Sequence, residues 1–225
     1  MKHLLRSAFG TALHISSRRI ALTAFALFTV AGSAHAVPVL FNSNPFAGST
    51  ANPDDGIRAV FAGNQVSLPG FDVKADQFVF DLSFFKAGST LSFANSLAAG
   101  LAPSGLNMIV LQDTGSAFNA GSAANLIADA VNVDGAGFFV YSNTVLGVNR
   151  LVYSTNLNAN TADLSILARI ESPSGAAAVA ALAGFGAANF VAAPVPEPST
   201  WALASAGMVL VGAVVRRRRR AAAVA

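Results

Sequence analysis

Histidine, the most frequent general acid or base in enzymes, occurs only within the first 36 positions of this 225-residue sequence. Its three histidines are His3, His14 and His35, and it contains no cysteine. The chain after residue 36 therefore lacks the side chains for a Ser-His-Asp or Cys-His nucleophilic site and for zinc bound by histidine or cysteine. Glu171 is the only glutamate before residue 194, so a carboxylate-pair hydrolase would have to use aspartates. We expect no catalytic residue and no enzyme activity.

Oxygen ligands for calcium are present, but they do not follow a calcium-loop pattern. Asp54 and Asp55 occur in the segment Asn-Pro-Asp-Asp-Gly, and Asp72 and Asp76 follow at wider spacing. Calcium prefers carboxylate oxygens, whereas an Asn-Pro-Asp-Asp-Gly segment is equally typical of a plain turn. The pattern D-x-[DN]-x-[DN]-G is absent. The sequence thus predicts no cofactor and leaves these four aspartates as the candidates for a structural calcium ion.

The net charge of +3 is unevenly distributed along the chain. Four of the 14 Lys and Arg residues lie within the first 19 positions, and five form the run 216–220. The region between them has five Lys and Arg and all 11 Asp and Glu, which gives it a net charge of −6. Nucleic-acid binding needs a basic face that neutralises phosphates. We therefore expect no nucleic-acid partner.

The N-terminal 36 residues have the layout of a secretory signal peptide. Four basic residues up to Arg19 precede the apolar run Ile20–Val30, which is too short to span a bilayer core of ~30 Å. Small residues at Ala34 and Ala36 fit a signal peptidase, so we predict cleavage before Val37 and passage through the export machinery. The arginine pair that ends the basic stretch also partly matches a twin-arginine signal, which leaves the export route open.

Residues 37–193 form the predicted exported domain, and its clearest segments are strands. Apolar and polar residues alternate through Gln77–Phe85, as expected for a strand with one buried face. Met108–Leu111 is a further apolar candidate. Phe138–Tyr141 and Leu151–Tyr153 flank a turn-rich stretch and are predicted to form a hairpin. Leu164–Ile170 fits either periodicity, and we interpret it as a strand that pairs with 151–154.

Helical patterns are fewer in this domain. Ser122 to Ala130 has apolar residues at i, i+3, i+4 and i+7, with Ser122 as the predicted N-cap. Gly175–Leu182 is a short Ala-rich helix candidate. The sequence therefore predicts a mainly-β, single sandwich-like domain with one or two short helices.

The C-terminal region 194–220 contains three successive elements. A proline-rich segment comes first, and its alternating prolines favour an extended linker. An uncharged apolar helix from Trp201 to Val215 comes next, about 22 Å long at ~1.5 Å per residue, which is short for a bilayer span. The arginine run is predicted to hold residues 221–225 in the cytoplasm. The motif residues are Val195, Pro196, Glu197, Pro198, Ser199 and Thr200, and the topology residues are Trp201, Arg216, Arg217, Arg218, Arg219 and Arg220.

In this order, the Pro-Glu-Pro segment, the short apolar helix and the terminal arginine run resemble the PEP-CTERM sorting signal of Gram-negative bacteria. The resemblance implies transient residence in the inner membrane and recognition by an exosortase, a membrane-bound cysteine transpeptidase that cleaves near Pro196–Pro198. It further implies delivery to the cell surface or extracellular matrix, where such proteins are associated with exopolysaccharide and with biofilm or floc formation.

The sequence leaves the role of residues 37–193 open. A structural or adhesive matrix component is one hypothesis, and a carbohydrate-binding module or an unrecognised secreted enzyme is another. A plain single-pass membrane anchor would explain the apolar helix and the arginines, but it would explain neither the shortness of that helix nor the Pro-Glu-Pro segment before it.

Overall fold

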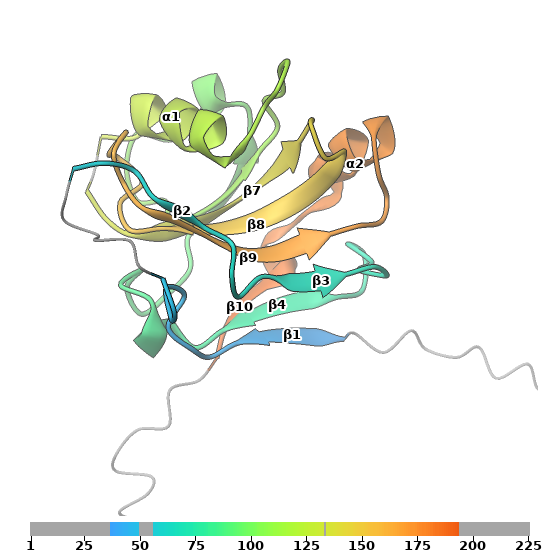
Figure 1. The fold of residues 1–225 in the computed structure, drawn as a ribbon, viewed down its shortest axis with the longest axis horizontal. Helices are drawn as coiled ribbons and strands as arrows, with labels where there is room; N and C mark the ends of the chain where they lie inside the picture. The colour runs from blue at the N-terminus through green and yellow to red at the C-terminus, as the bar shows by residue number, and fades with distance from the viewer. Residues whose placement is uncertain (1–36, 50–55, 133, 194–225) are drawn as a thin grey trace, which may run out of the picture. The chain divides into compact units, whose positions relative to one another are not determined.

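The computed structural model describes residues 37–49, 56–132 and 134–193. Within these residues the chain is mainly β with two short α-helices, as predicted (Figure 1). The strands are β1 Pro38–Phe41, β2 Val60–Phe61, β3 Val66–Leu68, β4 Gln77–Phe80, β5 Phe93–Ser96, β6 Met108–Leu111, β7 Gly137–Asn143, β8 Val148–Ser154, β9 Leu164–Ile170 and β10 Phe190–Ala192. The α-helices are α1 Ala120–Ala130 and α2 Ala176–Ala181, and the single-turn 3-10 helices are η1 Leu82–Phe84, η2 Ala98–Gly100, η3 Leu182–Gly184 and η4 Ala187–Asn189.

The larger sheet has the strand order β2-β9-β8-β7-β6-β5, and β3 also pairs with β9. Strands β7, β8 and β9 are antiparallel neighbours, which confirms the predicted hairpin and the predicted pairing of β9 with β8. The remaining pairs in this sheet are parallel. Strands β6 to β9 are almost wholly buried, as expected for a sheet that is covered on both faces.

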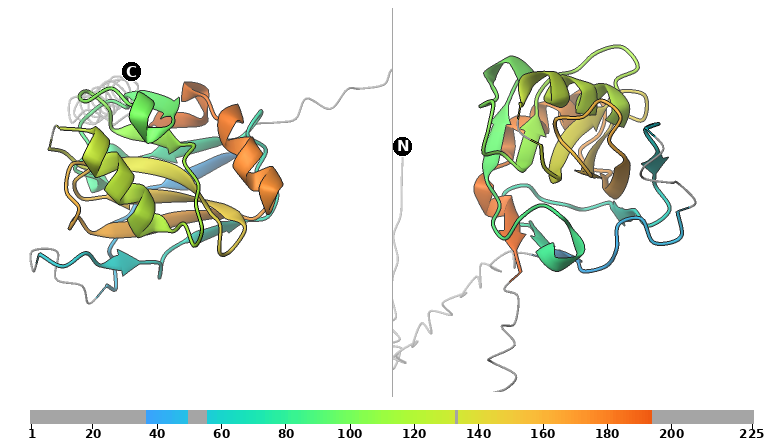
Figure 2. Two further views of the ribbon diagram at one scale, coloured as in Figure 1. Left: turned by 90° about the horizontal axis from the view of Figure 1, so that it is seen from above. Right: turned by 90° about the vertical axis from the view of Figure 1, so that its left-hand side faces the viewer.

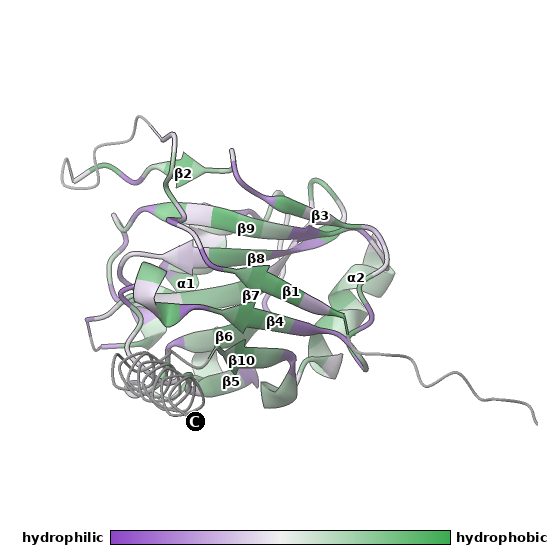
Figure 3. Ribbon diagram, turned by 90° about the horizontal axis from the view of Figure 1, so that it is seen from below, coloured by the Kyte–Doolittle hydropathy of each residue, from purple (hydrophilic) through white to green (hydrophobic). Residues whose placement is uncertain are grey.

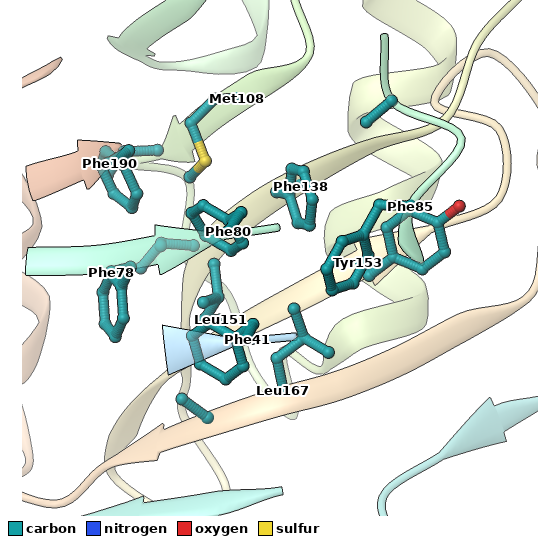
Figure 4. Packing of buried hydrophobic residues seen from close by; sticks show 14 of the residues in the cluster. Phe41, Phe78, Phe80, Phe85, Met108, Phe138, Leu151, Tyr153, Leu167 and Phe190 are labelled. Carbon is teal, nitrogen blue, oxygen red and sulfur yellow. The ribbon is translucent and has the colours of Figure 1, made fainter. Parts of the chain in front are cut away.

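The smaller sheet contains β1, β4 and β10, all parallel, with β4 in the centre. Figure 3 shows these three strands lying across one face of the larger sheet, with hydrophobic residues predominating along them. Their inner face supplies Phe41, Phe78, Phe80 and Phe190 to a core that includes Phe138 of β7 (Figure 4). The ring centroids of Phe80 and Phe138 are 4.4 Å apart. The two sheets therefore face each other through an aromatic core.

Helix α1 covers the opposite face of the larger sheet (Figure 2). Ala123 and Ile127 are fully buried in this second core. The predicted N-cap at Ser122 is wrong. Asn119 is the cap, because its side-chain oxygen accepts a hydrogen bond from the backbone N–H of Ser122 at 3.1 Å, which places Ser122 inside the first turn. The Ala-rich helix predicted near 175–182 is present as α2.

The strand predicted to continue to Phe85 ends at Phe80. The carboxylate of Asp81 accepts hydrogen bonds from the backbone N–H and the hydroxyl of Ser83, at 3.1 and 2.6 Å, and this capping starts the 3-10 helix η1. The change of backbone period rotates the next aromatic residues. As a result Phe84 is 46% exposed, whereas Phe85 is 4% exposed and joins the core.

Replacing Phe80 by alanine is expected to cost about 3–5 kcal/mol of unfolding free energy, because it leaves a cavity in the aromatic core. Phe84→Ala removes the same number of atoms from an exposed position and should cost less than about 1 kcal/mol. Urea unfolding followed by circular dichroism measures both variants. Equal losses would show that the sequence alternation, and not the 3-10 turn, describes this segment.

Candidate functional site

The small sheet holds both ends of the described domain. Pro38 of β1 pairs with Gln77 at the start of β4, and Ala192 of β10 pairs with Phe80 at its end. Because all three strands are parallel, the chain enters this sheet at one end of β4 and leaves it at the other. Each end adjoins a position where the sequence predicts proteolytic processing, so these two junctions form the candidate site.

Asp76 organises the N-terminal junction. One of its carboxylate oxygens accepts a hydrogen bond from the backbone N–H of Val37 at 3.0 Å, and the other accepts one from the N–H of Asp72 at 2.9 Å. The residue is only 8% exposed. Asn189 lies beside it and donates its side-chain amide to the carbonyls of Val73 and Asp76, at 2.7 and 2.9 Å. The first residue of the predicted mature chain is thus bound directly to a buried carboxylate.

The C-terminal junction ends in a backbone hydrogen bond. The N–H of Ala193 donates to the carbonyl of Phe80 at 2.7 Å, which extends the β10–β4 ladder by one residue. Pro196 comes three residues later in the sequence. Three residues of extended chain span at most about 10 Å. The Pro-Glu-Pro segment therefore starts close to the fixed end of the sheet.

The segment that begins at this junction matches a known family. Residues 194–220 match the PEP-CTERM protein-sorting motif. The chain carries a PEP-CTERM sorting signal. The signal implies export, handling at the membrane and an exosortase as the processing partner, which agrees with the resemblance seen in the sequence. No curated protein and no solved structure matches this chain.

Most of the predicted processing residues lie outside the described residues. These are Ala34 and Ala36 at the predicted signal cleavage site, and the sorting and topology residues from Val195 to Arg220. Their roles stay predictions. Among the described residues, no helix is long and apolar enough to cross a bilayer.

Of the four calcium candidates, two lie within the described residues and two lie outside them. Asp54 and Asp55 lie outside the described residues. Asp72 accepts a hydrogen bond from the N–H of Lys74 at 2.9 Å, and both oxygens of Asp76 are occupied by backbone N–H groups. Within the described residues, no three His, Cys, Asp or Glu side chains gather as a metal site would require. Asp76, which the sequence suggested as a calcium ligand, is a capping group for two backbone segments.

The described domain also has a hollow of about 300 Å³, whose lining mixes Lys86, Asn107 and Asp134 with apolar residues. Hydrogen bonds from Asn156 and Asn158 lower the pKa of the Asp134 carboxyl. A general acid or base works best with a pKa near the operating pH. The shift at Asp134 moves its pKa further from neutrality, so it does not favour proton transfer by this carboxyl.

Cleavage before Val37 would convert its amide nitrogen into an α-ammonium group beside Asp76. We therefore expect Asp76→Ala to destabilise the exported protein by about 2–4 kcal/mol, because two backbone donors and a charge lose their acceptor. Asp81→Ala is the matched control, since the Asp81 carboxylate caps only the local turn at Ser83, and it should cost about 1 kcal/mol. Thermal unfolding compares the two variants, and an equal effect would contradict the role of Asp76.

Adding residues at this junction provides a second measurement. A protein processed to retain Ala36 would move its charged amine one residue away from Asp76. It should unfold at a lower temperature than the protein that begins at Val37, and Asp76→Asn should remove most of that difference. If both forms unfold at the same temperature, the terminal amine does not interact with Asp76.

Proposed function

We propose that this protein is exported, is held transiently in the inner membrane by its PEP-CTERM tail and is cleaved by an exosortase near Pro196–Pro198. The released domain, residues 37–193, then serves at the cell surface or in the extracellular matrix as a structural or adhesive component. The observation that carries the proposal is the sorting motif at residues 194–220. The position of that motif directly after the last strand supports the release of an intact domain.

The chemistry of the domain supports a non-catalytic role. It has no histidine and no cysteine, and Glu171 is its only glutamate. Lys74 and Lys86, the cations that a Ser-Lys mechanism would need, are both exposed. A lysine acts as a base only when burial or a neighbouring cation lowers its pKa. Adhesion or structural support therefore fits these residues better than hydrolysis.

Carbohydrate binding is the second candidate function. The hollow lined in part by Lys86, Ser104 and Asp134 supports it, because ammonium, hydroxyl and carboxylate groups can bind the hydroxyl groups of a sugar. This role is compatible with the same route to the surface, and it concerns the ligand of the domain and not its sorting.

The sorting proposal is tested by replacing Pro196, Glu197 and Pro198 together with alanine. Insertion into the membrane depends on the apolar helix and the arginine run, so the variant should still be inserted. It should accumulate uncleaved in the inner membrane, with surface protein reduced at least tenfold. Fractionation with immunoblotting measures this distribution, and mass spectrometry of surface protein from the unaltered chain should find no Arg216–Arg220.

Pro194→Ala is the matched control, because it removes one nearby proline and leaves the Pro-Glu-Pro segment intact. Its sorting should equal that of the unaltered chain. Surface protein that still carries Arg216–Arg220, in a host that has an exosortase, would instead support a plain single-pass anchor. Equal sorting of the triple variant would contradict recognition of the motif.

A further inference from the structure

A transverse row of polar side chains crosses four strands of the larger sheet. Tyr141 of β7 pairs with Arg150 of β8, Arg150 pairs with Arg169 of β9, and Arg169 pairs with Ser67 of β3. Residues directly opposite one another in a sheet share a face. Tyr141 belongs to the core beneath α1, so the whole row lies on that face of the sheet.

The row places two positive charges side by side. Directly opposite residues in antiparallel strands have Cβ atoms about 4.5–5.5 Å apart, and like charges at that spacing repel. Glu171 pairs with Arg169 at 3.5 Å and accepts a hydrogen bond from the hydroxyl of Ser67 at 2.6 Å. In the part of the chain that the structure describes, this is the only ion pair, so Arg150 has no carboxylate partner there. The row therefore has an excess positive charge.

The two arginine side chains are partly buried. The Nε atom of Arg150 is buried and has no hydrogen-bond partner in the structure. The Nε atom of Arg169 is also buried, and its contact with Glu171 at 3.5 Å is an ion pair without a hydrogen bond. The side chain of Arg169 is nevertheless 39% exposed, and Ser67 at the end of the row is exposed. Tyr141, at the other end, is fully buried and holds an amide hydrogen bond from Asn143 at 3.1 Å. The row thus forms a surface with one rigid buried end and one accessible end.

We propose that Arg150 and Arg169 bind the carboxylate of a uronic-acid residue in a polysaccharide. A guanidinium group is planar and carries donors in a fork that matches a carboxylate, and two adjacent forks can share one anion. Such an anion relieves the repulsion between the arginines. The choice of a polysaccharide rests on the proposed function, because a protein at the cell surface meets such polymers. The arginine site itself does not depend on any sorting step.

The charge of the protein favours sparse carboxylates over a dense polyanion. The chain between its basic ends has a net charge of −6. Double-stranded nucleic acid carries one charge per about 1.7 Å of its axis, so a single small basic row cannot offset the repulsion from the acidic remainder. A polysaccharide with one carboxylate per sugar, or fewer, presents a single anion to the row at a time.

The phenol of Tyr141 gives a spectroscopic signal for the site. Burial raises the pKa of Tyr141, while the hydrogen bond from Asn143, the positive charge of Arg150 and a side-chain hydrogen bond with Arg150 lower it. An anion bound to Arg150 would offset that charge and raise the pKa further. Absorbance at alkaline pH, with Tyr153→Phe to remove the second tyrosine, follows Tyr141 alone.

The test measures binding in detergent of the full chain whose basic ends (Lys2, Arg6, Arg18, Arg19 and Arg216–Arg220) are replaced by glutamine, because these ends would bind any polyanion. The ligand is polygalacturonate, and neutral dextran and double-stranded DNA are the comparison probes. Polygalacturonate should bind, and the other two should not. Arg150→Gln should weaken binding at least tenfold, as expected for a charge-assisted hydrogen bond. Glu171→Gln removes the competing carboxylate and should tighten binding about two- to fivefold. Lys74→Gln, which removes one charge elsewhere, should leave binding unchanged.

Several results would overturn the proposal. They are equal binding of dextran, preferential binding of DNA, no binding of polygalacturonate, and an Arg150→Gln protein that binds normally. Competition by inorganic phosphate that exceeds competition by free galacturonate would reject the carboxylate assignment. Weakening by Lys86→Gln but not by Arg150→Gln would place the ligand in the hollow. Because Glu171 is at the surface, the Glu171→Gln arm remains decisive if Arg150→Gln fails to fold. None of these results depends on cleavage of the tail.

Discussion

Strand β4 is the constraint on which the rest of the domain depends. It pairs with the first strand on one side and the last strand on the other, and it places Phe78 and Phe80, both fully buried, between the two sheets. Parallel strands cannot be joined by a tight turn, so the sheet is complete only when Ala193 and everything before it are available. If the chain crosses the membrane unfolded and N-terminus first, it can complete this sheet only after its last strand has crossed.

Aromatic packing and side-chain to backbone hydrogen bonds stabilise the domain in place of disulfides and ion pairs. Phe71 stacks on Phe78 with ring centroids 4.4 Å apart. Arg58 donates to the carbonyls of Ala162 and Gly121 at 3.1 and 2.9 Å, and these bonds join the segment before β2 to α1 and to the segment before β9. Burial lowers the pKa of Arg58, and the negative charge of Asp163 raises it. Most of these contacts involve neutral partners, and the buried carboxylates of Asp76 and Asp163 act as acceptors for backbone N–H groups and not as members of ion pairs.

Local patterns predicted the antiparallel pairings of the fold and the existence of the parallel strands β4 and β6, but they did not predict the parallel pairings. The hairpin of β7 and β8 was predictable because its partners are close in sequence and bounded by turn residues, and β6, β9 and α1 were marked by apolar runs or periodicity. β1 and β10 are short, and their partner in β4 is distant in the chain, so no local pattern indicates them. The role of Asp76 was hidden for the same reason, because its bond to Val37 exists only after β1 and β4 pair. The sorting motif was readable because it is a contiguous sequence pattern, which can be identified without the fold.

The boundary between the folded domain and the sorting motif lies where the partner strand β4 ends. Ala193 donates its N–H to the carbonyl of Phe80, which is the last residue of β4. After Phe80 the chain forms the 3-10 helix η1, so β4 has no further strand residues with which the chain after Ala193 could pair. Pro196 follows Ala193 by three residues, and three residues of extended chain span at most about 10 Å. The covalent chain then limits how far the sorting motif can lie from the domain. The surface of the domain, including the arginine row, stays available for other ligands.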